Sequence, residues 1–267
     1  MIKLAVFGNP IEHSLSPDIH AQFAQQTGLM VEYRKILAPI DGFSDSANQF
    51  ISEGASGFNI TVPFKLDAFN FASELTLNAK MAGAVNTIKI KDDVAIGENT
   101  DGIGLVNDLV DNLKINLKDK IVLILGAGGA TQGVLLPILE KSPKRVMIAN
   151  RTASKAKKLQ QDFSSYGKTC GFGLEKIKHN PVDIIINATS ASLDGKMPNI
   201  AGGCANGAIC YDLMYGKQTP FMDWAKENNA AMIVDGLGML VEQAASSFEF
   251  WTGKKPDTQS VINSLRR

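Results

Sequence analysis

The chain has 267 residues, of which 45% are hydrophobic and 20% are charged, and its 27 basic residues balance 27 acidic ones. This composition is typical of a globular protein with one large domain or two smaller ones. A net charge of zero does not favour a nucleic-acid partner, and no apolar run reaches the roughly 20 residues of a membrane helix. We therefore expect binding to neither nucleic acid nor membrane.

The cysteines and histidines are scattered along the chain. They are Cys170, Cys204, Cys210, His13, His20 and His179. The cysteines lack metal-site spacing and cannot all pair with one another, which fits a reducing cytoplasm. The histidines form no zinc cluster, so no metal site is expected. The apolar run in residues 1–8 is too short for a secretion signal and predicts a core strand.

The first hundred residues predict alternating strands and helices. An apolar strand at Lys3–Phe7 is broken before Pro10, and Ser16 is the expected N-cap of a helix that Gly28 ends. The other expected elements are a strand at Glu32–Leu37, a helix at Phe43–Ser52, a strand at Phe58–Val62, a helix at about Phe64–Phe71, and a hairpin of Val85–Ile90 with Val94–Gly97.

The middle of the chain predicts a doubly wound parallel sheet. Ile121–Leu125 is a continuous apolar run, as expected for a strand buried on both faces. Repeated strand–helix units follow, and these units build such sheets. They are a helix to about Leu139, strands at Arg145–Ala149, Val182–Asn187, Ala208–Asp212 and Ala231–Val234, and helices at Ser154–Phe163 and Pro220–Asn228. Helices at Met239–Trp251 and Val261–Leu265 end the series.

A lysine and an aspartate follow strands in the first half of the chain. Lys65 comes just after Pro63, which ends a strand, and Asp101 lies in the Gly-rich turn at residues 98–104. A lysine at a helix start is most often simply solvated. The second turn, with its carboxylate, and a nucleotide-binding loop further on favour a proton-handling pair instead.

A glycine-rich loop joins the strand Ile121–Leu125 to the next helix. It consists of Gly126, Ala127, Gly128, Gly129 and Ala130. Small residues let the backbone approach a pyrophosphate, and the helix N-terminus offers free N–H groups and partial positive charge. A loop in this context favours nucleotide binding over a purely structural tight turn.

The end of the following strand indicates NADP rather than NAD. NAD-binding folds tend to place an acidic residue about 20 residues on, where it bonds the ribose 2′-hydroxyl. This chain has Asn150, Arg151 and Thr152 there, with Lys155 one turn later and no acid before Asp162. Arg151 and Lys155 suit a 2′-phosphate, although a solvated basic helix start is the alternative.

Seven motifs together resemble those of bacterial shikimate dehydrogenases, in the order of that family and over essentially the whole chain. They are residues 8–17, 59–65, 82–87, 99–102, 126–130, 150–152 and 235–244. The resemblance implies an N-terminal α/β substrate domain, a Rossmann-like NADP domain and a cleft between them. Their expected boundaries are 1–101 with 237–267, and 102–236. The implied reaction is the reversible NADPH-dependent reduction of 3-dehydroshikimate to shikimate, in aromatic amino acid biosynthesis.

The same resemblance assigns roles to individual residues. Lys65 and Asp101 match the catalytic pair. The implied substrate-binding residues are Ser14, Ser16, Thr61, Asn86, Asp101, Tyr215 and Gln243. The implied cofactor-binding residues are Gly126, Ala127, Gly128, Gly129, Ala130, Asn150, Arg151, Thr152, Lys155, Thr189, Leu213, Met214 and Gly236.

Three of these assignments stay open. Hydroxyls of Ser14 and Ser16 beside a helix N-terminus suit the substrate carboxylate, but Ser16 could merely cap its helix. Many family members have methionine where this chain has Leu213, so either Leu213 or Met214 could face the nicotinamide. Lys65 is either a true acid/base or an electrostatic orienter, because burial and a neighbouring carboxylate act on a lysine in opposite directions.

Two other functions are considered. A quinate/shikimate dehydrogenase would accept an extra ring hydroxyl and use NAD more broadly; the two serines and residues 150–155 favour the shikimate and NADP type. A regulatory protein that binds the cofactor without turnover would lack the Lys65 and Asp101 pair, and both are present. We expect a cytoplasmic monomer or homodimer whose partner is a small-molecule substrate.

Overall fold

The computed structural model describes the chain except residues 178–181, 190, 192–195, 199 and 267, so His179 lies outside the described residues. The chain divides into two compact units: unit 1 is Met1–Gly104 with Leu240–Arg267, and unit 2 is Leu105–Met239. The expected α/β class is confirmed, whereas the assignment of the domains at 1–101 with 237–267 and 102–236 stays a prediction. No helix in the described part of the chain has the length and apolarity to cross a membrane.

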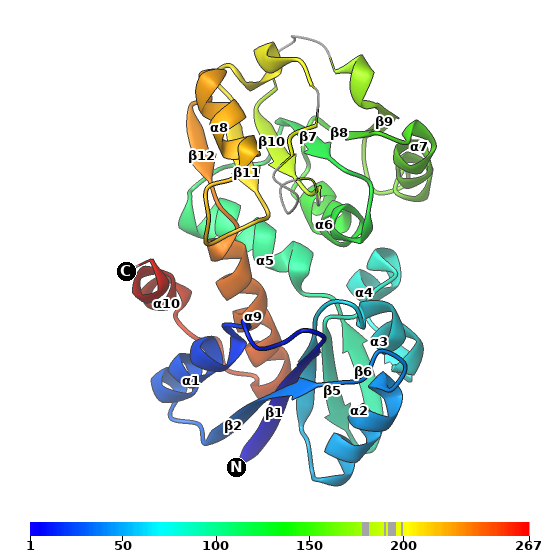
Figure 1. Ribbon diagram of the computed structural model, residues 1–267, viewed down its shortest axis with the longest axis vertical. Helices are drawn as coiled ribbons and strands as arrows, with labels where there is room; N and C mark the ends of the chain where they lie inside the picture. Colours follow the sequence, from blue (N-terminus) through cyan, green and yellow to red (C-terminus); the bar gives the residue numbers. More distant parts are fainter. Residues whose placement is uncertain (178–181, 190, 192–195, 199, 267) are drawn as a thin grey trace. The chain divides into compact units, whose positions relative to one another are not determined.

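A six-stranded mixed sheet forms the centre of unit 1, in the order β2-β1-β3-β5-β6-β4 (Figure 1). Its strands are β1 (Ile2–Gly8), β2 (Val31–Leu37), β3 (Gly57–Ile60), β4 (Glu74–Leu75), β5 (Thr87–Lys91) and β6 (Val94–Glu98). β1 pairs in parallel with β2 and β3, and β5 pairs antiparallel with β3 and β6. Asp92 and Asp93 both have positive φ, as a tight hairpin turn requires, so the predicted hairpin is present.

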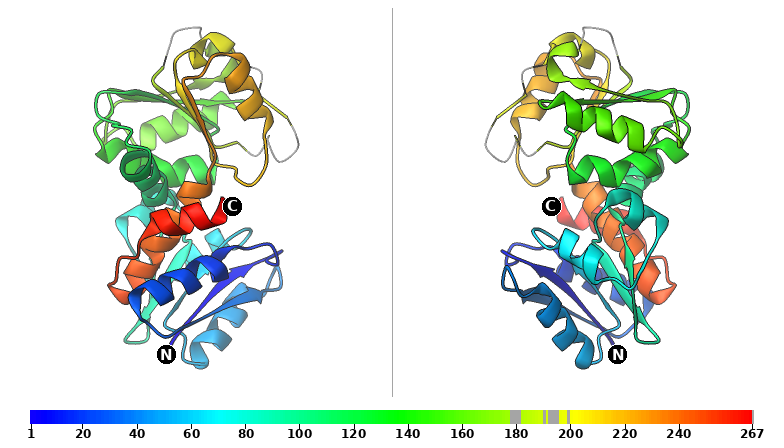
Figure 2. Two further views of the ribbon diagram at one scale, coloured as in Figure 1. Left: turned by 90° about the vertical axis from the view of Figure 1, so that its left-hand side faces the viewer. Right: turned by 90° about the vertical axis from the view of Figure 1, so that its right-hand side faces the viewer.

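Helices cover both faces of this sheet (Figure 2). They are α1 (Ser16–Thr27), α2 (Phe43–Ser52), α3 (Lys65–Phe71), α4 (Leu77–Ala82), α9 (Leu237–Thr252) and α10 (Thr258–Leu265). A further helix, α5 (Asp101–Asn107), begins in unit 1 and ends in unit 2. Successive strand residues point to opposite faces of a sheet. Phe7 and Phe58 lie on the face that packs against α2, α3 and α4. On the other side α1, α9 and α10 form a cluster around Phe23 and Phe248.

The side chain of Trp251 fixes α9 to the sheet. Its indole Nε1 donates a hydrogen bond to the carbonyl of Ile88 in β5, at 2.8 Å. The ring lies so close to Gly57 that a Cβ there would be 2.4 Å from the indole nitrogen. The close approach of α9 therefore requires glycine at position 57.

Unit 2 contains a six-stranded sheet in the order β12-β11-β10-β7-β8-β9, and every strand pair is parallel. The strands are β7 (Ile121–Leu125), β8 (Arg145–Asn150), β9 (Thr169–Gly173), β10 (Ile184–Asn187), β11 (Ile209–Asp212) and β12 (Met232–Val234). The winding direction reverses between β7 and β10. Ligands of doubly wound sheets bind at such a switch point, at the carboxyl ends of the strands.

The helices of unit 2 complete the predicted Rossmann-like layering. They are α6 (Gly129–Glu140), α7 (Ala153–Asp162) and α8 (Pro220–Glu227), with the short helices η1 (Asp108–Asn112), η2 (Leu174–Lys176) and η4 (Gly202–Ala205). Leu123 and Leu125 of β7 share a buried cluster with Phe221 of α8. Val122 and Ile124 alternate with them and are equally buried. Both faces of β7 are thus covered, as its continuous apolar run predicts.

Several expectations about local structure were wrong. Ser16 is the first residue of α1, so Leu15 holds the N-cap position, and no side chain caps the helix. The strand expected at Phe58–Val62 ends at Ile60. Asp101, expected in a turn, begins α5. The sequence reading also missed β4, α4, η1 and β9.

The sequence does not predict the edge strand β9, because the strand contains two glycines and glycine is a poor strand former. Gly171 is nevertheless required, since a Cβ at this position would be 2.2 Å from the Ala156 carbonyl oxygen in α7. The strand can form only where a helix passes this closely over it, and that contact leaves no local pattern.

His20 is fully buried among aromatic side chains. Its ring stacks on Tyr33 with a centroid distance of 4.3 Å and lies 5.4 Å from Trp251. Neither ring nitrogen has a hydrogen-bond partner. Burial lowers the pKa of His20 from 6.5 to about 3, and a weaker effect of the Asn59 side chain opposes it. The imidazole is therefore neutral in the fold at pH values where it is protonated in the unfolded chain.

The fold should become less stable as the pH falls below 6.5, because the unfolded chain then binds a proton that folded His20 does not. The wild type should lose about 2 kcal/mol of its free energy of unfolding through this group between pH 7.5 and pH 5. His20→Phe keeps the ring contacts and should remove this loss. Urea titrations of both proteins at the two pH values measure it, with His13→Phe as the exposed control. An unchanged pH dependence in His20→Phe would contradict the interpretation.

Candidate functional site

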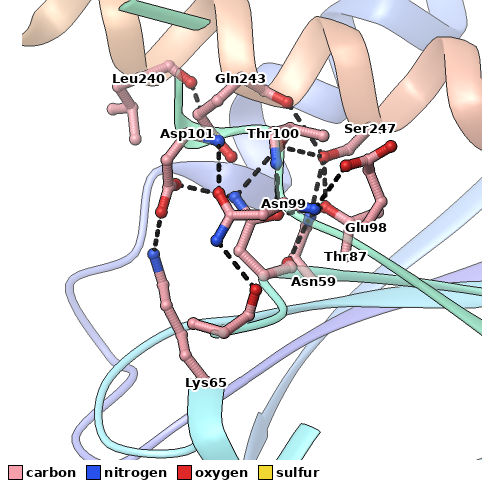
Figure 3. Close-up of polar contacts among 12 residues, drawn as sticks. Asn59, Lys65, Thr87, Glu98, Asn99, Thr100, Asp101, Leu240, Gln243 and Ser247 are labelled. Carbon is pink, nitrogen blue, oxygen red and sulfur yellow. Dashed lines mark hydrogen bonds and ion pairs between the residues drawn. The ribbon is translucent and has the colours of Figure 1, made fainter. Parts of the chain in front are cut away.

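Lys65 and Asp101 form an ion pair in unit 1 (Figure 3). The ammonium Nζ lies 2.5 Å from Oδ2 of Asp101. Lys65 is the first residue of α3 and Asp101 the first of α5. Their side chains are 31% and 18% exposed, so the pair is shielded from bulk water without being sealed off. The structure thus brings together the two residues that sequence analysis selected.

Asn86 holds the second oxygen of the Asp101 carboxylate. Its Nδ2 donates to Oδ1 of Asp101 at 2.8 Å. Its own Oδ1 accepts the backbone N–H of Thr100 at 3.0 Å, and a backbone N–H can only donate. This contact fixes the orientation of the amide, because Nδ2 must then face the aspartate. Both carboxylate oxygens of Asp101 therefore act as acceptors, one for a cation and one for an amide.

The backbone before Asp101 is anchored as well. Asn99 Oδ1 accepts the Asp101 N–H at 3.1 Å, and Asn99 Nδ2 donates to the carbonyl of Ala84 at 3.0 Å. Glu98 Oε1 accepts from Thr76 Oγ1 at 2.8 Å and from the Asn99 N–H at 2.7 Å. Burial raises the pKa of Glu98, and these hydrogen bonds oppose the shift. The position of the Asp101 carboxylate is thus set by contacts on both sides of it.

A buried polar network lies behind the pair, and sequence analysis missed it. Asn59 Nδ2 donates to Thr87 Oγ1 and to Ser247 Oγ, both at 3.0 Å. Thr87 Oγ1 in turn donates to Asn86 Oδ1 at 2.9 Å. Asn59, Thr87 and Ser247 are at most 6% exposed. They connect β3, β5 and α9 to the amide that holds Asp101.

The other predicted substrate-binding residues are distributed over both units. Ser14, Ser16, Thr61 and Gln243 belong to unit 1, whereas Tyr215 belongs to unit 2. The Ser16 N–H donates to Ser14 Oγ at 3.3 Å. Gln243 Nε2 donates to the Leu240 carbonyl at 2.8 Å within α9. Of the predicted substrate-binding residues in the described part of unit 1, only Asn86 forms a side-chain hydrogen bond to the Lys65–Asp101 pair.

The glycine-rich loop of unit 2 has the geometry of an anion cradle. Gly128 is the N-cap of α6, and no side chain caps this helix. A Cβ on Gly128 or Gly129 would have no atom within 4 Å, so open space lies above both. The N–H groups of the first helical turn have no intrahelical partner and can bind a pyrophosphate. These residues therefore fit the phosphates of a dinucleotide.

Two cations follow the end of β8. Arg151 and Lys155 are both exposed, and neither takes part in an ion pair with another described residue. Asn150 Nδ2 donates to the Thr152 carbonyl at 3.0 Å, which shapes the turn that carries Arg151. The donor set fits a phosphate monoester at this strand end.

The remaining predicted cofactor residues lie at the ends of β10, β11 and β12. The Leu213 N–H donates to the Asn187 carbonyl at 3.1 Å, and the Gly236 N–H donates to the Met214 carbonyl at 2.9 Å. A Cβ at Gly236 would be 2.3 Å from the Leu213 carbonyl oxygen, so this approach requires glycine. Burial raises the pKa of Tyr215 in the same segment. That Leu213 or Met214 faces a nicotinamide stays a prediction.

No group of three or more His, Cys, Asp or Glu side chains in the described segments could hold a metal ion.

Gly126→Ala should destabilise the loop, because Gly126 has a φ of +105° and its Cβ would lie 3.0 Å from the Ala188 carbonyl oxygen. We expect a loss of about 1–3 kcal/mol in the free energy of unfolding. Gly129→Ala is the matched control: it begins α6 with open space around it, so alanine should be tolerated. Chemical denaturation measures both, and equal losses would contradict the assigned strain.

Comparison with known proteins covers both units. Residues 6–88 match the family model of the shikimate dehydrogenase substrate binding domain, residues 108–194 that of shikimate/quinate 5-dehydrogenase, and residues 236–266 that of the shikimate 5′-dehydrogenase C-terminal domain. The shikimate dehydrogenase (NADP⁺) of Ruthia magnifica is 74% identical over 266 residues, which cover 100% of both chains.

Solved structures resemble this chain over almost its whole length. The Ael1 enzyme from Pseudomonas putida has a TM-score of 0.96 at 43% identity, with 99% of this chain and 98% of that chain covered. Shikimate 5-dehydrogenase from Thermus thermophilus, solved in complex with NADP(H) and shikimate, has a TM-score of 0.87 at 30% identity, with 100% and 99% covered. The resemblance inferred from the motifs is confirmed: this chain belongs to the shikimate dehydrogenase family.

Proposed function

We propose that this protein catalyses the reversible NADPH-dependent reduction of 3-dehydroshikimate to shikimate. The observation that carries the proposal is the contact between the Lys65 ammonium and the Asp101 carboxylate, in a chain of this family. The relative from Ruthia magnifica is named shikimate dehydrogenase (NADP⁺), and shikimate 5-dehydrogenase from Thermus thermophilus was solved in complex with NADP(H) and shikimate.

Lys65 is the proposed source of the proton. NADPH, when bound, supplies a hydride to the C3 carbonyl carbon of the substrate. The carbonyl oxygen gains negative charge as the hydride arrives, and it must receive a proton to become the hydroxyl of shikimate. A positioned ammonium can donate that proton or stabilise the charge while water donates it. In the oxidative direction the same group would accept the proton.

Asp101 keeps the ammonium in place. Its Oδ2 accepts from Lys65, while Asn86 and the Asn99 turn hold its other oxygen and its backbone. A lysine side chain has four rotatable bonds, so a fixed acceptor reduces its freedom and orients a proton toward the substrate. We propose that Ser14 and Ser16 bind the substrate carboxylate and that Thr61, Asn86, Gln243 and Tyr215 bind ring hydroxyls, as in the family.

The cofactor assignment rests on the donor set of unit 2. The open backbone N–H groups at the start of α6 suit a pyrophosphate, and Arg151 with Lys155 suits a 2′-phosphate. We propose that Thr189, Leu213, Met214 and Gly236 line the nicotinamide end. The expectation of NADP over NAD follows from the two cations and the absence of an acid at that strand end in the sequence.

We also propose that the protein works in the cytoplasm, as a monomer or homodimer. All three cysteines are free thiols, and Cys204 and Cys210 are buried. Such thiols are usual in a reducing compartment.

A spectrophotometric assay tests the function: NADPH formation from NADP⁺ and shikimate by the purified protein. Quinate replaces shikimate, and NAD⁺ replaces NADP⁺, in parallel reactions. The second candidate, a quinate/shikimate dehydrogenase, is included because residues 108–194 match a family model that bears both names. We expect shikimate with NADP⁺ to give the highest kcat/KM, and equal rates on quinate would favour the second candidate.

Lys65→Ala should lower kcat about 10²–10⁴-fold, the range usual for a lost general acid or base. The KM for shikimate should change only a few-fold, because the ammonium acts mainly in the transition state. Lys120→Ala is a matched control, since Lys120 also forms an ion pair, 3.0 Å from Asp183 in unit 2, and has no proposed role. A rise in KM with unchanged kcat would make Lys65 a binding residue only.

Arg151→Ala should raise the KM for NADP⁺ about tenfold or more and leave the KM for NAD⁺ unchanged, because only NADP⁺ has a 2′-phosphate. Arg145 lies at the opposite end of the same strand, β8, and is exposed, so Arg145→Ala controls for loss of a surface charge. Initial rates at varied cofactor concentration measure the effect. Equal losses with both cofactors would argue against recognition of the 2′-phosphate by Arg151.

A further inference from the structure

A buried carboxylate ends β11 in unit 2. The Asp212 side chain is 0% exposed and forms no ion pair with any described residue. Burial raises its pKa, and hydrogen bonds from Thr219, Met214 and Asn187 oppose that shift. Burying a carboxylate without a cation costs free energy. The role of Asp212 should therefore lie in the groups that donate hydrogen bonds to its two oxygens.

Three neutral donors share this carboxylate. Oδ1 accepts from the Met214 N–H and from Asn187 Nδ2, both at 3.1 Å. Oδ2 accepts from the Thr219 hydroxyl at 2.6 Å. Both oxygens are thus used as acceptors, which is the pattern of an ionised carboxylate.

Two of these donors are the ends of one loop. Met214 lies two residues after the strand, and Thr219 is the N-cap of α8, where its hydroxyl oxygen accepts the Met222 N–H at 3.3 Å. Asp212 therefore ties the loop at residues 213–219 to the sheet at both ends. This loop carries Leu213 and Met214, two of the residues proposed to line the nicotinamide, and the proposed substrate residue Tyr215.

The third donor extends the contact to the neighbouring strand. Asn187 ends β10 and uses its Nδ2 for Asp212, so its Oδ1 faces the other way. That oxygen accepts the Thr189 N–H at 3.2 Å and the Thr189 hydroxyl at 2.7 Å. Thr189 in turn lies against the glycine-rich loop, since a Cβ on Gly126 would be 3.3 Å from its methyl carbon. One carboxylate thus organises the ends of β11 and β10, and β10 is one of the two strands that border the switch point.

A carboxylate at the other end of the same sheet also accepts hydrogen bonds with both oxygens, but it is 36% exposed and paired with a cation. Asp183 precedes β10 and accepts the Ile121 N–H at 2.8 Å and the Lys120 ammonium at 3.0 Å. Its contacts join the amino ends of strands and involve none of the proposed cofactor residues. Asp183 thus differs from Asp212 in exposure, in its cationic partner and in the groups that it positions.

We propose that Asp212 is a positioning residue for the dinucleotide: it does not touch the cofactor, but fixes the loop at 213–219 and, through Asn187, Thr189 in the geometry that binds it. The inference rests on the proposed function only in that a nicotinamide dinucleotide binds unit 2. It does not depend on the identity of the reduced substrate.

Asp212→Asn tests the inference, because the amide replaces one acceptor oxygen with a donor that faces other donors. We expect the Kd for NADP⁺, measured by calorimetry without substrate, to rise about tenfold or more. We expect the KM for shikimate to rise as well, because Tyr215, which we propose to bind the substrate, lies on the same loop. The Kd for NADP⁺ measured without substrate is therefore the deciding readout. A purely structural role would lower the unfolding temperature or the active fraction without a specific loss of cofactor affinity.

Asp183→Asn is the matched control, and it should leave the Kd for NADP⁺ unchanged even if it lowers the unfolding temperature. Thr219 gives a second pair of variants in case Asp212→Asn does not fold. Thr219→Val removes the hydroxyl that donates to Asp212 and should weaken NADP⁺ binding. Thr219→Ser keeps this hydroxyl and should bind NADP⁺ with the wild-type Kd.

Several outcomes would overturn the inference: a folded Asp212→Asn or Thr219→Val protein with the wild-type Kd, an equal loss in Asp183→Asn, or no binding of NADP⁺ by the wild type. A wild type that binds NADP⁺ but does not oxidise shikimate would refute the proposed function and leave the binding test of Asp212 intact.

Discussion

The ion pair between Lys65 and Asp101 is the interaction on which the proposed chemistry depends. A lone lysine at the start of a seven-residue helix would be free to move in solvent. Here its ammonium is held by a carboxylate that is itself held by Asn86 and by the turn at Asn99. Because these contacts fix the carboxylate, the Lys65 ammonium is already ordered in the folded protein. Its conformational entropy is therefore lost on folding and not on substrate binding.

The features that sequence could predict are those with a local cause. A continuous apolar run such as Ile121–Leu125 indicates a strand covered on both faces, and a loop of small residues between strand and helix indicates a phosphate site. The edge strand β9 depends instead on the passage of α7 over Gly171, and the start of α5 at Asp101 depends on side chains of the preceding loop. Contacts of this kind form only in the folded chain.

The site also contains both residues that local motifs predict and residues whose contacts form only in the folded chain. The motifs identified Lys65, Asp101 and Asn86 by residue type and order. They did not include Ser247, which bonds Asn59 across 188 positions of sequence, and they assigned no role to Thr87, which links Asn59 to Asn86. A serine in the middle of an apolar helix face gives no indication of its partner. Ser16 shows the reverse case, because its sequence context favours a cap that the chain does not form.

Burial and partner type together separate the roles of the carboxylates of Asp101 and Asp212. Asp101 is 18% exposed and is paired with a cation, so a ligand can reach its partner and a proton can be exchanged there. Asp212 is 0% exposed and is surrounded by neutral donors, so it can neither meet a ligand nor transfer a proton to one. What an inaccessible acceptor can do is fix the groups that donate to it. The first arrangement therefore suits chemistry, and the second suits the shape of a binding surface.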